Sequence, residues 1–117
     1  VVTGWSYGSG RPWAADGIVT DADLPCKDHG THVASLLGGA TYGVAKDVTI
    51  IPVEVLDCNG RGSKQQTMSG LDWVVEDMKR HKGTKAVVSM SIGGGKSQAQ
   101  NDLIATLHDN EDIVVVV

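Results

Sequence analysis

Short apolar runs alternate with amphipathic segments along most of this 117-residue chain. The runs are typical of buried strands, and in the segments between them the apolar side chains recur at helical spacing. Strands separated by single helices favour a parallel sheet with helices on its faces, because parallel neighbours need a long crossover connection. The sequence therefore predicts an α/β fold in the order βαβαβαβ. The expected strands are residues 1–5, 48–56, 86–90 and 113–117, and the expected helices are residues 29–38, 63–81 and 97–109.

The first connection and the last strand each carry a further expectation. Residues 6–28 contain Gly, Asp and Pro without a clear period, and a loop of this length is usually functional. Residues 113–117 are typical of a strand that is buried on both faces. Because domains rarely stop inside such a strand, we expect the chain to be part of a larger protein.

Composition excludes several classes of partner. The net charge is −4 and no cluster of Lys and Arg is present, which argues against nucleic acid and anionic membrane surfaces. The longest purely apolar run, residues 113–117, is far shorter than the ~20 residues that a membrane span needs. The length corresponds to one domain.

One histidine stands where a Gly-containing turn enters an apolar helix, in the segment DHGTHVA at residues 28–34. With a pKa near ~6.5, an imidazole at this place could take and return a proton. Ligands of parallel sheets gather outside the carboxyl ends of the strands, where the turn before His29, residues 59–62 and residues 91–95 are expected. A single His is more often structural, so the segment alone leaves both interpretations open.

Five segments together resemble the subtilisin-like serine proteases (subtilases, peptidase S8 family), in the branch of proteinase K and the aqualysin-like enzymes. They occur in the family's order and at matching intervals: HGTHVA at 29–34, TYGVAK at 41–46, VEVLDCNGRGS at 53–63, GLDWV at 70–74 and SMSIGGG at 89–95. The resemblance implies a subtilisin-like three-layer α/β/α fold, incomplete here, and an endopeptidase that cleaves polypeptides by a Ser-His-Asp mechanism.

The resemblance also assigns roles to individual residues. His29 matches the general base that accepts the nucleophile's proton and returns it to the leaving amine, whereas His32 matches a structural position. Residues 60–62 and 91–93 match two edges between which an extended peptide pairs as an added strand. The implied substrate-binding residues are Leu56, Gly60, Arg61, Gly62, Lys64, Thr67, Ser91, Ile92 and Gly93.

Two substrate pockets follow from these matches. Leu56 would line the pocket for the residue two positions before the scissile bond. Lys64, Thr67 and Ile92 match positions around the pocket for the residue four positions before it. Because Lys64 and Thr67 replace the bulky apolar residues usual there, we expect acidic or polar substrate residues to be tolerated.

Other catalytic parts of the family have no match in this sequence. The Asp that orients the His would precede residue 1, and the oxyanion-stabilising Asn and the nucleophilic Ser would follow residue 117. Residues 1–117 are thus expected to be a partial catalytic domain, inactive alone, whose partner is the missing remainder. The alternative is a non-catalytic relative that keeps the peptide-binding edge and serves in binding or assembly.

Cys26 and Cys58 are the two cysteines. They could be free core thiols, but Cys at both positions resembles the aqualysin-like pattern, in which the two are bonded to each other. A persistent disulfide implies secretion or another oxidising compartment.

Two further kinds of site have weak signals. His29 and His32 lack the spacing and the Glu of HExxH, so no metal site and no cofactor is expected, and no calcium ligands can be assigned here for the complete protein. The segment GGGKS at 93–97 looks like the end of a phosphate-binding P-loop, but Met90 stands where that motif needs Gly. A nucleotide-binding module is the weakest of the three hypotheses.

Overall fold

The computed structural model describes residues 5–6, 11–12, 29–111 and 113–117. The chain forms two compact units, residues 1–62 and 63–117, and each unit is described here by itself. None of the helices in the described part is both long and apolar enough to cross a membrane.

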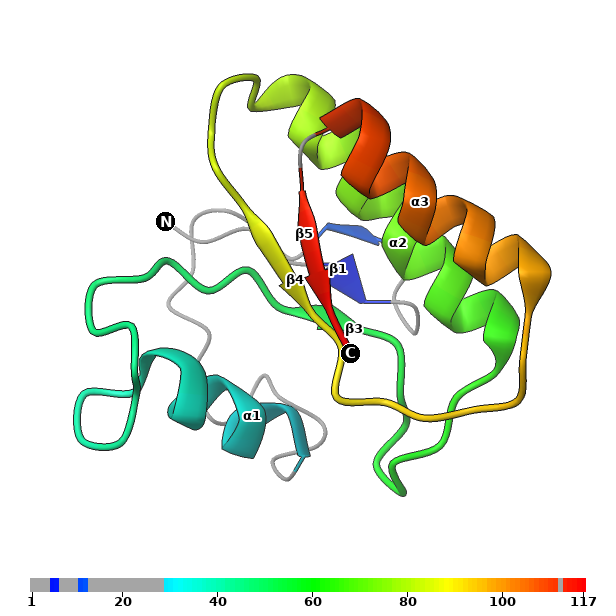
Figure 1. The fold of residues 1–117 in the computed structure, drawn as a ribbon. Coiled ribbons are helices and arrows are strands. Elements are labelled where there is room, and N and C mark those ends of the chain that lie inside the picture. The colour runs from blue at the N-terminus through cyan, green and yellow to red at the C-terminus, as the bar shows by residue number, and fades with distance from the viewer. Residues whose placement is uncertain (1–4, 7–10, 13–28, 112) are drawn as a thin grey trace. The chain divides into compact units, whose positions relative to one another are not determined.

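The described residues of the first unit form a small mixed sheet and a helix (Figure 1). The elements are β1 (Trp5–Ser6), β2 (Arg11–Pro12), α1 (His29–Gly38) and β3 (Val53–Glu54). β1 lies between its two neighbours and pairs antiparallel with β2 and parallel with β3. The parallel pair agrees with the predicted α/β fold, and residues 1–4 of the first predicted strand lie outside the described residues.

The strand β2 corrects the prediction that residues 6–28 form a loop throughout. Residues 7–10 and 13–28 of that segment lie outside the described residues. β2 is at an edge of its sheet, where a proline such as Pro12 is tolerated. A strand of two residues is too short to show an alternating pattern, so the sequence carried no signal for it.

The prediction of a long buried strand at residues 48–56 was wrong in extent and in burial. The observed strand β3 is confined to Val53–Glu54, and its residues are half-buried. Val48 and Ile51 are 48% and 44% exposed. A strand is buried on both faces only where helices cover both, and Pro52, just before β3, has no amide to donate to a ladder.

The second unit contains two helices and a parallel pair of strands among its described residues (Figure 1). The elements are α2 (Lys64–Arg80), β4 (Val87–Ser89), α3 (Gln98–Glu111) and β5 (Val114–Val116). β4 and β5 pair in register from Val87 with Val114 to Ser89 with Val116, and α3 is the crossover between them. All four elements lie within two residues of their predicted bounds.

Helix α2 shows why these predictions were accurate. Ser63 is its N-cap: the Ser63 hydroxyl accepts a hydrogen bond from the amide of Gln66, and the side chain of Gln66 accepts one from the amide of Ser63. At the other end, His81 is the C-cap, and Gly83 follows with a φ of 85°. Such positive φ values favour glycine, so the helix ends where the sequence predicted.

One hydrophobic core holds the second unit together. Leu107 and Ile113 are fully buried in this core, which also includes side chains from α2 and β4. The buried residues are Leu71, Val75, Met90, Leu107 and Ile113, and the partly buried residues packed against them are Val74, Met78, Val88, Ile92, Leu103, Ile104 and Val115. The α2 and α3 helices pack against each other, and α3 also packs on β5.

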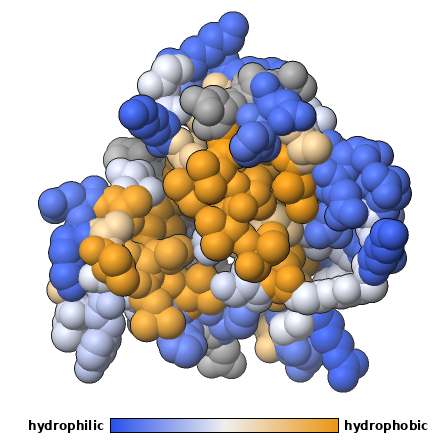
Figure 2. Space-filling model, viewed as in Figure 1, coloured by the Kyte–Doolittle hydropathy of each residue, from blue (hydrophilic) through white to orange (hydrophobic). Residues whose placement is uncertain are grey.

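The prediction that β5 is buried on both faces was wrong. Val114 and Val116 are each 54% exposed, and Val87 on β4 is 65% exposed. Figure 2 shows apolar side chains gathered where Figure 1 draws β4 and β5. Alternate residues of a strand point to opposite faces, so Val115 reaches the core under the helices while Val114 and Val116 remain on the open face.

Candidate functional site

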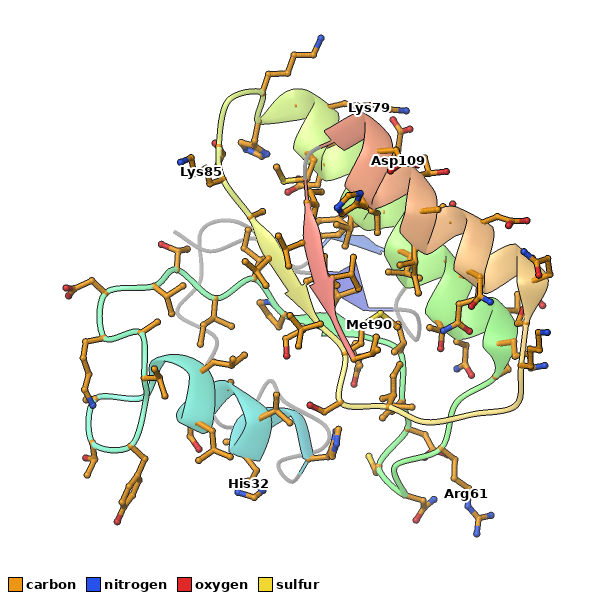
Figure 3. All side chains as sticks on the ribbon, in the orientation of Figure 1. His32, Arg61, Lys79, Lys85, Met90 and Asp109 are labelled. Atoms are coloured by element: carbon orange, nitrogen blue, oxygen red, sulfur yellow. The ribbon has the colours of Figure 1, made fainter. Side chains whose placement is uncertain are left out.

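The predicted general base, His29, is the first residue of α1. Its side chain is exposed, and so is that of His32, which points away from α1 in Figure 3. A ring at the first position of a helix can reach solvent or a substrate, because no preceding helical turn covers it. Asp28, the residue before His29, lies outside the described residues.

The second predicted site segment is a tight turn that follows β3. The Asp57 amide donates a 2.7 Å hydrogen bond to the carbonyl oxygen of Arg61, and the Gly60 amide donates one of 3.0 Å to the carbonyl of Asp57. The side chain of Asp57 accepts bonds of 2.9 Å from the amides of both Asn59 and Arg61. The carboxylate of Asp57 therefore accepts two of the hydrogen bonds that hold this turn.

Asp57 was not among the predicted site residues. Its amide bonds, the one from Arg61 foremost, hold the pKa of this exposed carboxyl below its ordinary value of 3.8. The sequence did carry a signal, because an Asp two residues before Asn-Gly is typical of a side chain that bonds its own turn.

The two predicted glycines of this turn have distinct structural reasons. Gly60 has a φ of 71°, which a residue with a Cβ adopts only at a cost. A Cβ on Gly62 would collide with the carbonyl oxygen of Val55. Between them the side chain of Arg61 is exposed and extends from the turn in Figure 3, and Leu56 is half-buried before it. The backbone at 60–62 thus carries little side chain apart from Arg61.

The third predicted segment continues directly from β4. The Met90 amide donates a 2.8 Å hydrogen bond to the carbonyl of Val116, which extends the pairing one residue beyond the strand. Ser91 and Gly93 are then exposed, whereas the side chain of Ile92 packs against the hydrophobic core. At the carboxyl end of β4, the core therefore holds the side chain of Ile92, whereas Ser91 and Gly93 are accessible to solvent.

Lys64 and Thr67 stand on the first turns of α2. Thr67 is buried, and its hydroxyl donates a 3.4 Å bond to the carbonyl of Ser63. Lys64 is exposed, and its ammonium donates a 3.0 Å bond to the carbonyl of Lys96. The structure thus brings Lys64 to the loop after β4.

The predicted site residues are divided between the two units. His29, Leu56 and residues 60–62 belong to the first, and Lys64, Thr67 and residues 91–93 belong to the second. Cys26 lies outside the described residues, so its bond to Cys58 remains a prediction. Within the described residues, no three His, Cys, Asp or Glu side chains are placed to hold a metal ion.

Comparison with known proteins identifies the family. The family model described as subtilase, peptidase S8, matches residues 9–117. The chain belongs to the subtilase family. The match also covers the Gly93–Ser97 segment, so this glycine run needs no nucleotide to account for it.

Similar subtilases include subtilisin-like protease 7 of two fungi. The protein of Arthroderma otae is 47% identical over 98 residues, which cover 84% of this chain and 24% of that protein. The protein of Trichophyton soudanense is 45% identical over 95 residues, which cover 81% and 24%. The chain thus spans about a quarter of the length of these subtilases.

A solved structure places the fold in the same family. A cold adapted subtilisin-like serine proteinase is 44% identical, with a TM-score of 0.60 over 66% of this chain and 27% of that chain. The predicted subtilisin-like α/β fold, incomplete in these residues, is therefore confirmed.

Proposed function

We propose that this chain is part of a subtilisin-like serine endopeptidase and contributes the catalytic general base and two peptide-binding edges. The observation that carries the proposal is the family match over residues 9–117, which includes His29 as the exposed first residue of α1. In this role the His29 imidazole takes the proton of a serine nucleophile as it attacks the peptide carbonyl. It then gives the proton to the leaving amine. The serine, the orienting aspartate and the oxyanion-stabilising asparagine belong to the remainder of the protein.

The substrate is a polypeptide in extended conformation. Residues 60–62 and 91–93 carry little side chain apart from Arg61 and Ile92, so the backbone of each segment can pair with an extended peptide. Leu56 lines the pocket for the residue two positions before the cut. Lys64, Thr67 and Ile92 surround the pocket for the residue four positions before it, where the positive charge of Lys64 favours acidic or polar side chains.

Replacement of the general base tests this proposal in the whole protein. His29→Ala is expected to lower kcat for a peptide substrate by roughly 10⁴- to 10⁶-fold, because the nucleophile loses its proton acceptor. His32→Ala, one helical turn away and also exposed, is the matched control and should keep most of the activity. Residues 1–117 alone should hydrolyse no peptide.

Two results would reject the proposal. Equal activity of the wild type and His29→Ala would show that this imidazole is not the base. A wild-type whole protein that binds peptides without cleaving them would favour the non-catalytic alternative, in which the same edges serve binding or assembly.

We further propose that Cys26 and Cys58 are bonded to each other and that the protein works in a secreted or otherwise oxidising compartment. Cys58, the cysteine within the described residues, is not a free thiol. A bond to Cys26 would tie the segment before His29 to the turn at residues 57–61. Closing a loop of this length stabilises the folded state by about 3–4 kcal/mol in the chain-entropy model.

Peptide mapping of the whole protein under non-reducing conditions tests the disulfide. A single linked peptide pair containing Cys26 and Cys58 is expected, and it should separate into two peptides after reduction. Recovery of both cysteines as free thiols would refute the bond and, with it, the argument for an oxidising compartment.

A further inference from the structure

A lysine side chain connects two segments that are far apart in the second unit's sequence. Lys64 is the first residue of α2, and its Nζ donates a 3.0 Å hydrogen bond to the carbonyl oxygen of Lys96, 32 residues later. The same Nζ lies over Gly95, where an added Cβ would be 3.8 Å away. The ammonium thus rests on the backbone of the loop between β4 and α3.

This loop has few other attachments. Among the described residues, the bond from Lys64 is the one hydrogen bond that joins residues 91–96 to another part of the chain. Within the described ranges, nothing lies within 4 Å of the Cβ positions of Gly93 and Gly94. Three consecutive glycines have the largest backbone freedom that a chain can offer, so an unattached loop here would sample many conformations.

The glycine run, residues 93–95, lies between two residues that are attached to other parts of the second unit. Ile92 packs against the hydrophobic core before it. After it, the carbonyl of Ser97 accepts a 3.1 Å bond from the amide of Asn101 in the first turns of α3. The bond from Lys64 adds an attachment at Lys96, directly after the three glycines.

The electrostatics of α2 do not account for a cation at this place. The N-terminal end of a helix carries partial positive charge, and the first turn of α2 contains no acidic residue. A lysine there is unfavourable unless its charge finds an acceptor. The carbonyl of Lys96 supplies one, and a hydrogen bond from an ionised donor is stronger than one between neutral groups.

We propose that Lys64 is a positioning residue for substrate: its bond to Lys96 holds the 91–96 loop so that residues 91–93 present a ready edge to an extended peptide. The inference rests on the proposed function, because it assigns the loop to that peptide-binding edge. Ordering a flexible edge on binding costs affinity, and an edge ordered in advance avoids that cost. The effect falls on substrates long enough to pair with residues 91–93.

The experiment uses the whole protein and three substitutions. Lys64→Met removes the donor and keeps the length of the side chain, whereas Lys64→Arg keeps a cationic donor. Lys85→Met is the matched control, because Lys85 is exposed and lies in the loop before β4 (Figure 3). Backbone ¹⁵N relaxation, which measures the order of each amide, is recorded in a His29→Ala background, which prevents self-digestion. Affinity is measured by calorimetry in the same background, with a peptide that supplies four residues before the scissile position, the fourth being alanine so that it makes no charge contact with Lys64, and with one that supplies two.

Lys64→Met is expected to lower the backbone order parameters of residues 93–96 into the range of flexible segments, below about 0.6. It should weaken binding of the longer peptide by about two- to ten-fold, the range that loss of one solvent-exposed hydrogen bond permits, and binding of the shorter peptide by much less. In the active protein the same factor should appear in KM for long substrates, with a smaller change in kcat. Lys64→Arg should keep most of the loop order and most of the affinity for the longer peptide, and Lys85→Met should match the wild type in both.

Each other outcome overturns the proposal at a distinct step. Unchanged order parameters in Lys64→Met refute the tether even if the protein is an active protease. Lower order parameters with an unchanged ratio of the two affinities show that the bond only stabilises the loop, and they refute the positioning role. A protein that binds neither peptide refutes the positioning role together with the proposed function, whereas cleavage lost but binding kept rejects only the catalytic proposal.

Discussion

Single residues determine the shape of the two segments proposed as peptide-binding edges, and they do so through backbone chemistry. Gly60 and Gly62 were predicted from the resemblance to the family, and the structure supplies their physical reasons in a positive φ and a close carbonyl. Asp57 could have been predicted from its place before Asn-Gly. The bond from Lys64 to Lys96 could not, because no local pattern connects residues 32 positions apart.

The carboxylate of Asp57 should make its turn sensitive to acid. Its pKa is lowered in the folded chain, so its contribution to the turn is fully present above the ordinary value of 3.8 and is lost as the pH falls through the lower, folded pKa. In an NMR titration the amide shifts of Asn59 and Arg61 should move together, with a midpoint below 3.8.

Two variants check that assignment. Asp57→Asn should abolish the common transition, because the neutral amide does not titrate. Asp47→Asn, at another exposed aspartate, should leave it unchanged. A midpoint at or above the ordinary value would contradict the hydrogen bonds from both amides.

At the scale of elements, the helices of the second unit were predicted closely because their start and stop signals are local. The capping box at Ser63 and Gln66 and the glycine after His81 act within one turn of the helix ends. Strand β3 was predicted less well in extent, because a strand lasts only as long as its neighbour pairs with it.

Loss of the α2 cap should destabilise the second unit. Ser63→Ala removes the acceptor for the Gln66 amide and should lower the free energy of unfolding by about 1 kcal/mol, within a range of about 0.5–2. Urea denaturation followed by far-UV circular dichroism measures it. Ser63→Asp, which keeps an acceptor and adds a charge favourable at this helix end, should retain the stability of the wild type. Equal losses in both variants would argue against the cap.

For the molecule as a whole, stability depends mainly on the side chains buried in the core of the second unit. Replacing an exposed side chain should change the free energy of unfolding much less. Leu107→Ala should lower the free energy of unfolding by about 2–5 kcal/mol, because Leu107 is fully buried among side chains of the core. Val116→Ala, on the exposed face of β5, should cost less than about 1 kcal/mol in this chain. Similar losses for the two, measured by urea denaturation, would contradict the one-sided burial of β5.

The sequence by itself determined the alternation of strands and helices, the bounds of α2 and α3 and the family, because periodicity, caps and motifs are written in neighbouring residues. Only the tertiary structure decided which face of β5 is covered, how short β3 is, that Arg11–Pro12 pairs with β1, and where the ammonium of Lys64 binds. The residue type alone does not tell which face of a strand a valine occupies or which acceptor a surface lysine binds. Their burial and partners follow from which distant segments pack beside them, and that information is not local.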